Sequence, residues 1–267
     1  MGFITIGSAS HVGLRKEENE DFVAYHAPED GSVPDKGVLL ALADGMGGHR
    51  GGAVAAKCAI DVIMKEYYGD SASDTPKSLK NAMMKANREV INKGDEDRNL
   101  QGMGTTLVAV VLKKDRMYSA HVGDSRGYTI YKNEISQFTE DDSIVAGLVK
   151  AGYITEEEAP SYPGSNIITK AIGIDPELKI GDPKMIKKIR PGQYILLCCD
   201  GLYKDVSNEE ILKTFQDFQE PDEICHKLIE KALERGGDDN ITVLTARIDE
   251  GGGFFSGLSE RFTNFLR

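Results

Sequence analysis

Acidic residues in this sequence recur where strand-like apolar runs end. Asp44 follows the apolar run "LLALA" and precedes the glycine-rich stretch "GMGGHRGG". Such a run indicates a buried strand, and glycine lets the backbone turn sharply and approach another group closely. A carboxylate placed there can hold a metal ion or face an anion, although a lone Asp-Gly pair could equally form an ordinary turn.

The same design occurs in five short motifs, which are "NED" (Asn19 to Asp21), "ADGMGG" (Asp44), "HVGDSRG" (Asp124), "LLCCDGL" (Asp200) and "GGDDNITVL" (Asp238 to Asn240). Strand ends converge in a sandwich, and converging carboxylates repel one another unless cations neutralise them. Oxygen ligands without clustered His or Cys favour Mg²⁺ or Mn²⁺. Two such ions, bridged by a carboxylate, could activate water for in-line attack on a phosphoester.

The elements that must position these carboxylates follow from the apolar patterns. Strand patterns occupy residues 3–10, 21–27, 37–44, 105–139, 184–189, 193–200 and 241–248, and helical patterns occupy residues 52–68, 76–94, 143–160, 208–218 and 222–234. Blocks of strands alternate with helix pairs instead of repeating strand–helix units. This order predicts a layered α+β sandwich and not a doubly wound parallel sheet.

Composition narrows the class of protein further. The chain has 267 residues and a net charge of −11, so nucleic acid phosphates would repel it. Its four cysteines, Cys58, Cys198, Cys199 and Cys225, have no C-x-x-C spacing, which is typical of a reduced, cytoplasmic protein. We recognise no signal peptide and no transmembrane segment, no P-loop motif and no Ser-His-Asp arrangement.

Eight motifs in order resemble the metal-dependent protein phosphatases, the type 2C protein serine/threonine phosphatases, and bacterial members in particular. They are "GLRKEENEDFV", "LADGMGGHRGG", "GMGTTLVAVVL", "HVGDSRGYTI", "FTEDDSIVAGLVKAGYITEEEA", "NIITKAIG", "ILLCCDGLYKDVSNEEI" and "GGDDNITVL". The resemblance extends from about Phe3 to Ile248. It implies two antiparallel sheets flanked by helix pairs, a four-layer α-β-β-α sandwich, with the metal ions at one end.

The resemblance also implies roles for individual residues. Asp44 would bridge two Mn²⁺ or Mg²⁺ ions, with a backbone carbonyl ligand from Gly45. Asp200 and Asp239 would bind one ion, and Glu20 and Asp21 would lie near the other. Asp124, with Asp200, would hold a weaker third ion. Asn240, Thr105 and Thr106 would not bind the ions themselves but would hold the ligands in position.

Several positions depart from the family pattern. Lys16 stands where relatives usually carry the arginine that grips the substrate phosphate, and Arg15 directly precedes it. Either Lys16 binds phosphate as a point charge, or a bulge lets Arg15 reach in. Asp142 and Tyr162 replace two histidines of the segment over the site. Met46 replaces a candidate general acid, which leaves water on the metal or His49 to deliver the proton.

The function implied is hydrolysis of phosphoserine and phosphothreonine on proteins by a metal-activated water, with Asp44, Asp200 and Lys16 as the catalytic residues. The enzyme would oppose a cognate bacterial Ser/Thr kinase. The alternatives are a pseudophosphatase or regulatory binding module with weak activity, and a phosphoesterase for small molecules. Residues 1–249 would form the catalytic domain, with a mobile flap at about 140–170.

The last residues, 250–267, form a predicted glycine hinge and a short amphipathic tail. Phe254, Leu258, Phe262 and Phe265 recur at helical spacing and give one apolar stripe within residues 254–266. This tail would either fold back on its own domain or dock on a partner.

Overall fold

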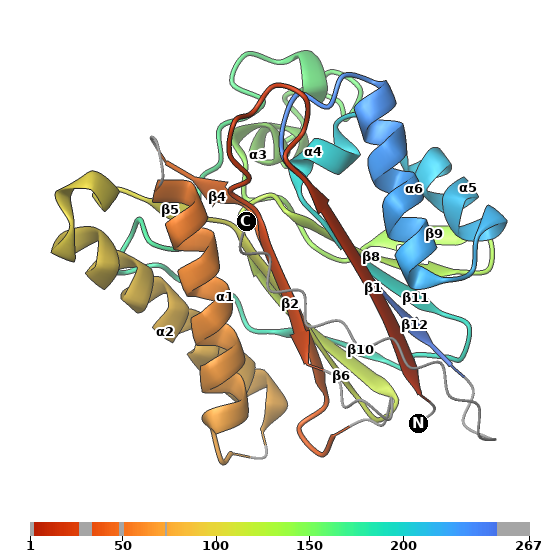
Figure 1. Cartoon of the computed structure of the whole chain (residues 1–267), viewed down its shortest axis with the longest axis horizontal. Coiled ribbons are helices and arrows are strands. Elements are labelled where there is room, and N and C mark those ends of the chain that lie inside the picture. The colour runs from red at the N-terminus through yellow and green to blue at the C-terminus, as the bar shows by residue number, and fades with distance from the viewer. Residues whose placement is uncertain (1–2, 27–33, 48–50, 73, 250–267) are drawn as a thin grey trace.

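Two five-stranded antiparallel sheets lie face to face in this protein, and helices cover the outer face of each (Figure 1). The structure is a computed structural model that describes residues 3–26, 34–47, 51–72 and 74–249. The observed layers confirm the predicted α+β sandwich with α-β-β-α order.

The first sheet has the strand order β1-β12-β11-β8-β9, and the second has the order β10-β7-β6-β3-β2. The strands of the first sheet are β1 (Ile4–His11), β12 (Ile241–Ile248), β11 (Tyr194–Cys198), β8 (Arg126–Tyr131) and β9 (Glu134–Gln137). Those of the second are β10 (Lys184–Lys187), β7 (Arg116–Val122), β6 (Leu107–Lys113), β3 (Val38–Ala43) and β2 (Phe22–His26). A short pair, β4 (Gly45–Met46) and β5 (Gly104–Thr105), lies beyond the end of β3.

Two long helices cover the second sheet, and three shorter helices cover the first. They are α1 (Gly51–Gly69) and α2 (Thr75–Glu96) on one side, and α4 (Asp200–Tyr203), α5 (Asn208–Asp217) and α6 (Pro221–Glu234) on the other. The segment between β9 and β10 contains α3 (Ile144–Lys150) and the 3₁₀ turn η2 (Ala159–Ser161), and η1 (Arg98–Leu100) follows α2. A capping box between Ser207 and Glu210 fixes the start of α5.

Three apolar layers hold the sandwich together, and the alternation of side chains along the strands explains them. In β3, Leu39 faces α1 and α2, while Leu40 and Leu42 face the other sheet. In β11, Cys198 faces the helices, and Cys199 after it belongs to the layer between the sheets. Both faces of these strands are buried, which is why their sequences are continuous apolar runs.

The strand register brings the five acidic motifs to one end of the sandwich. Phe22 pairs with Ala43, Leu107 with Val122, and Cys198 with Val243. Because neighbouring strands are antiparallel, a residue that precedes one strand lies beside a residue that follows its partner. Asp21 therefore comes beside Asp44, and Asp200 comes beside the start of β12.

The structure differs from the predicted elements at three points. Gly94 does not end α2, which continues to Glu96; a Cβ at Gly94 would lie 3.2 Å from the Leu100 carbonyl oxygen, so this glycine permits close packing. Strand β11 ends at Cys198, and Asp200 begins α4. Only Ile144–Lys150 of the predicted 143–160 segment is α-helical.

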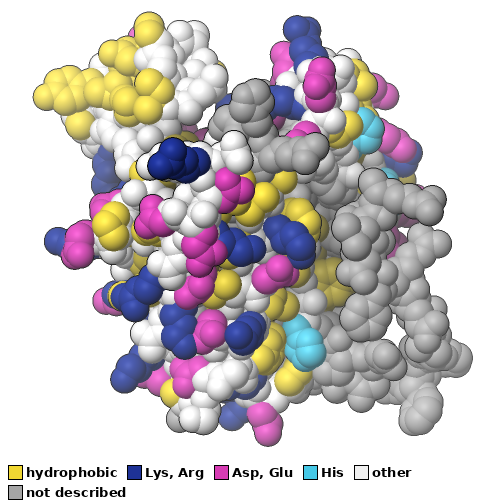
Figure 2. Space-filling model, turned by 60° about the vertical axis from the view of Figure 1, so that its left-hand side comes forward, with side chains coloured by type: hydrophobic (Ala, Val, Ile, Leu, Met, Phe, Trp, Pro, Cys, Tyr) yellow, Lys and Arg dark blue, Asp and Glu magenta, His cyan; other side chains and the backbone are white. Residues whose placement is uncertain are grey.

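The surface offers two further observations. On the face in Figure 2, the Lys and Arg side chains of the described residues are interspersed with Asp and Glu side chains. Among the described residues, no helix combines the length and apolar character needed to cross a membrane. The predicted hinge and tail, residues 250–267, and His49 lie outside the described residues.

Candidate metal centre

Asp44 lies between β3 and β4, where three hydrogen bonds fix its backbone. Its N–H donates to Thr106 Oγ1 at 3.0 Å, and its carbonyl oxygen accepts from the Thr106 N–H at 2.9 Å and from Thr105 Oγ1 at 2.8 Å. Both threonines are buried. Thr105 and Thr106 therefore hold the Asp44 backbone in place and leave its carboxylate free to face the other acidic residues.

Asp21 and Glu20 lie at the start of β2, directly beside Asp44. Asp21 is 6% exposed, yet among the described residues neither of its carboxylate oxygens has a hydrogen-bond partner, and Glu20 Oε1 also lacks one there. Unpartnered buried polar atoms are costly in a folded protein. These oxygens are therefore arranged for a group other than the protein itself.

Asn240 connects the Glu20 segment to the first sheet. Its Oδ1 accepts from the Glu20 N–H at 2.9 Å, and its Nδ2 donates to the carbonyls of Val12 and Glu18 at 2.9 and 3.0 Å. One amide side chain thus ties the β1–β2 connection to the start of β12. The role in supporting metal ligands that the resemblance implies for Asn240 stays a prediction.

Glycines allow this part of the backbone to pack closely. The Gly45 N–H donates to the Glu20 carbonyl at 3.2 Å, and a Cβ at Gly45 would lie 2.3 Å from the Gly52 carbonyl oxygen. A Cβ at Gly52 would lie 2.4 Å from Glu20 Oε1. Only residues without a side chain can bring α1 this close to the acidic cluster.

Asp200 and Asp239 come from the first sheet, and each is paired with a lysine. Lys16 Nζ lies 2.6 Å from Asp239 Oδ1, and Lys204, one turn along α4, pairs with Asp200. Arg15 instead pairs with Asp238 at 2.7 Å, and both of those side chains are largely exposed. The structure thus brings Lys16 to the cluster, while Arg15 and Asp238 form a surface ion pair.

Asp124 follows β7 and is almost fully buried. Beside it, Arg126 makes a bidentate ion pair with Asp141 and stacks on the Tyr203 ring of α4, 3.7 Å from the ring centroid. Asp142 pairs with Lys170 and accepts from the Gly123 N–H at 3.2 Å. These contacts hold the start and the end of the 140–170 segment in place next to Asp124.

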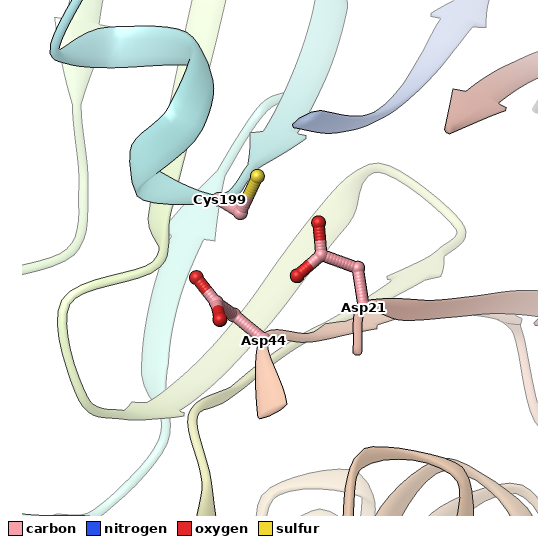
Figure 3. A group of neighbouring side chains, drawn as sticks. All are labelled: Asp21, Asp44 and Cys199. Atoms are coloured by element: carbon pink, nitrogen blue, oxygen red, sulfur yellow. The ribbon is translucent and has the colours of Figure 1, made fainter. Parts of the chain in front are cut away.

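Cys199 is the residue at this site that sequence reasoning missed. Ligand atoms of Asp21, Asp44 and Cys199 all lie within 4.8 Å of one another (Figure 3). The sequence placed both adjacent cysteines in an apolar strand. Because side chains alternate along a strand, only one of the two cysteines could face the layer between the sheets. The apolar pattern did not show where β11 ends or which of the two cysteines faces that layer.

Burial and mutual repulsion disturb the protonation of these carboxyls. Burial, followed by the neighbouring carboxylates, raises the pKa of Asp21 and that of Asp44 well above the usual range. Burial, then Asp200 and Asp141, raises the pKa of Asp124 to about 6. Burial also raises the pKa of Glu20. In each case burial is the largest cause, because it disfavours the charged form of the carboxyl, and nearby carboxylates add to it.

The cluster fits divalent cations. Three buried oxygens of Glu20 and Asp21 lack partners among the described residues, the cluster is negatively charged, and carboxylate oxygens are the ligands that Mg²⁺ and Mn²⁺ take. Asp21 and Asp44, at strand ends of the second sheet, lie close enough to Asp200 and Asp239, beside the first sheet, for their charges to interact. The residues present are those that could hold such ions at the end of the sandwich.

Removing metal ions should reverse the way stability depends on pH. The raised pKa values mean that these carboxyls bind protons in the folded, metal-free protein that they do not bind in the unfolded chain. Their contribution to stability is therefore full near pH 4 and is lost as the pH rises towards about 7. We expect the melting temperature in EDTA to be higher at about pH 5 than at about pH 7.5. With saturating Mn²⁺ the order should invert, because protons compete with the ion. Parallel trends in the two conditions would contradict this assignment of the charge.

An antiparallel double-sheet sandwich with a partly buried carboxylate cluster at one end defines a class of metal-binding α+β proteins. The family model described as protein phosphatase 2C matches residues 15–233. The chain is 34% identical to the serine/threonine phosphatase stp of Listeria innocua over 83% of its own length and 90% of that protein. This chain belongs to the protein phosphatase 2C family, as its motifs predicted.

A second relative adds a solved structure. The chain is 38% identical to the serine/threonine protein phosphatase PstP of Mycobacterium tuberculosis over 88% of its own length, but it spans only 45% of that protein. The chain also resembles a crystal structure of the PstP catalytic domain in complex with two manganese ions, with a TM-score of 0.79 and 36% sequence identity. The similarity covers 93% of this chain and 99% of the chain in that crystal structure.

Proposed function

We propose that this protein hydrolyses phosphoserine and phosphothreonine on proteins with the help of two Mn²⁺ or Mg²⁺ ions. The observation that carries the proposal is the set of buried, unpartnered carboxylate oxygens at the point where both sheets end. Membership of the protein phosphatase 2C family and the two manganese ions of the related catalytic domain support it. Bound ions of this kind supply a nucleophile at neutral pH and neutralise charge on a phosphoryl group.

The side chains of the chain then have distinct tasks. Asp44, held by Thr105 and Thr106, would bridge two ions, and Asp200 and Asp239 would bind one of them. Glu20, Asp21 and the Gly45 carbonyl would surround the other, and Asp124 with Asp200 would hold a weaker third. Lys16 is half-exposed at the rim, where its ammonium can meet an incoming phosphate.

Purified protein should release phosphate from a phosphoserine peptide in Mn²⁺ and stop when EDTA is added. The same assay on p-nitrophenyl phosphate compares protein substrates with small phosphoesters. If ions bind but neither substrate is hydrolysed, the regulatory binding module is the correct alternative. The complete set of acidic residues favours the enzyme, because a binding module would not need all of them.

Replacing Lys16 tests how phosphate is recognised. Lys16→Ala should raise KM for a phosphopeptide more than it lowers kcat, because a mobile ammonium contributes mainly binding. Lys16→Arg should keep or improve activity, since a guanidinium can bind phosphate with two hydrogen bonds. Arg15→Ala is the matched control and should change little, because Arg15 pairs with Asp238 at the surface. The reverse ranking of the two alanine variants would show that Arg15 is the phosphate-binding residue.

Partners and location are also proposals. A Ser/Thr kinase in the cytoplasm of a bacterium would supply phosphorylated proteins to this enzyme, and the 254–266 tail would dock on such a partner. Deleting residues 251–267 tests the tail. A lower melting temperature would mean that the tail packs on its own domain, whereas unchanged stability with loss of a bound kinase would mean partner docking.

A further inference from the structure

The acidic cluster contains one soft ligand that hard cations do not need. Cys199 is fully buried at the end of β11, in the layer between the sheets. Figure 3 shows its thiol beside the carboxylates of Asp21 and Asp44, and the ligand atoms of the three residues lie within 4.8 Å of one another. Two carboxylates and a thiol match the oxygen and sulfur ligands that zinc accepts.

The second observation is the Asp21 carboxylate. Asp21 is 6% exposed and points into the same space, and neither oxygen has a hydrogen-bond partner in the part of the chain that the structure describes. The thiol, in contrast, is already oriented. Cys199 Sγ accepts from the Thr242 N–H at 3.1 Å and donates to the Asn240 carbonyl at 3.3 Å. The N–H donor would remain in place if the sulfur became a thiolate, and thiolate is the form that binds metals.

We propose that Asp21, Asp44 and Cys199 form a mixed oxygen–sulfur site that captures a thiophilic divalent cation, of the chemical class of Zn²⁺ and Cd²⁺. On binding, the S–H bond is replaced by a metal–sulfur bond, and the proton leaves to solvent. Three protein ligands leave a fourth position for water. The ligand atoms need to approach by about 1 Å to reach the bond lengths of zinc.

This site overlaps the one proposed for Mn²⁺ and Mg²⁺ but uses a different ligand. Hard ions prefer oxygen ligands, so they would leave Cys199 as a thiol that is hydrogen-bonded to the Asn240 carbonyl. A soft ion would recruit the sulfur and occupy Asp44, so it would exclude the hard ion. Cys199 therefore sets the preference of the site for soft over hard cations.

Cadmium and zinc binding test the proposal without any phosphatase assay, so the result does not depend on the proposed function. Wild-type protein titrated with Cd²⁺ should gain the ultraviolet absorption of a cadmium–thiolate bond, and Cys199→Ser should not. Calorimetry should show Zn²⁺ affinity falling in Cys199→Ser by at least about 10-fold, since even residues that only orient a ligand cost about 10–100-fold when lost. Mn²⁺ affinity should change less than about threefold, because hard ions do not need the sulfur. Cys198→Ser is the matched control, since that neighbouring buried cysteine faces the helices, and it should retain both the absorption and the Zn²⁺ affinity.

Wild-type protein without a cadmium–thiolate band would overturn the proposal, whether or not Cys199→Ser folds. A band retained in Cys199→Ser would overturn it too, as would equal Zn²⁺ affinity in the two proteins. Asp21→Asn keeps the side-chain volume and provides a second variant, in which Zn²⁺ affinity should also fall. An unchanged Zn²⁺ affinity in this variant would exclude Asp21 as a ligand and would contradict the proposed three-residue site.

Discussion

Asp44→Asn should reduce Mn²⁺-dependent hydrolysis of a phosphoserine peptide by several orders of magnitude. The side chain keeps its size but loses the charge that both catalytic ions would share, and those ions generate the nucleophile. The same change should raise the melting temperature of the metal-free protein, because it removes a carboxyl whose charged form is disfavoured by burial and by the neighbouring carboxylates. Activity and stability thus move in opposite directions, which a misfolded variant could not imitate.

The matched control is Asp61→Asn on α1, which removes an exposed carboxylate paired only with Lys57. Its activity and melting temperature should stay near those of the wild type, because exposed ion pairs contribute little. Asp200→Ala should lose activity as Asp44→Asn does. Near-wild-type turnover of purified Asp44→Asn would reject the carboxylate-bridged mechanism.

Gly201→Ala should destabilise the fold by about 3 kcal/mol, as overpacking of a close contact does. A Cβ at this position would lie 2.1 Å from the Asn240 carbonyl oxygen, so α4 and the start of β12 would have to separate. That separation moves Asp200 away from Asp239, and Mn²⁺ affinity should fall with stability. Urea denaturation followed by circular dichroism measures the first effect, and calorimetry measures the second.

Gly69→Ala is the control for this substitution. Gly69 ends α1, and an added Cβ would meet nothing within 4 Å. Its unfolding midpoint should stay the same or rise slightly, because alanine favours helix more than glycine does. Equal midpoints for the Gly201 and Gly69 variants would mean that the contact with Asn240 does not limit the packing.

The fold could be predicted because local and global signals agree. The continuous apolar runs of β3 and β11 reflect burial on both faces, and the amphipathic helices α5 and α6 bury one face each. The acidic cluster could be predicted from strand ends alone, since antiparallel neighbours place such ends together. Helix ends were less predictable: Gly94 reads as a stop signal in sequence, but its contact with Leu100 depends on the tertiary fold.

The sequence could not predict in which direction particular side chains point. Lys16 and Arg15 are adjacent cations, and only the path of the backbone before β2 shows which one meets Asp239. Cys198 and Cys199 are likewise adjacent and identical, and they face opposite layers. The pairing of Lys204 with Asp200 depends on α4 beginning at Asp200, a residue that the apolar pattern placed at the end of a strand.

Acidic residues beside both sheets meet at one end of the sandwich only, and this affects how that end unfolds locally. Asp21, Asp44 and Asp124 adjoin the ends of strands of the second sheet, while Asp200 and Asp239 adjoin strands of the first. Ions shared between them would therefore cross-link the sheets at that end alone. Amide hydrogen exchange near Thr106 and Thr242 should then slow as the ion concentration rises, while exchange at the opposite end, near Ile4 and Ile248, should follow global unfolding only. The free ion concentration would thereby control how often the sandwich opens, independently of whether a substrate is present.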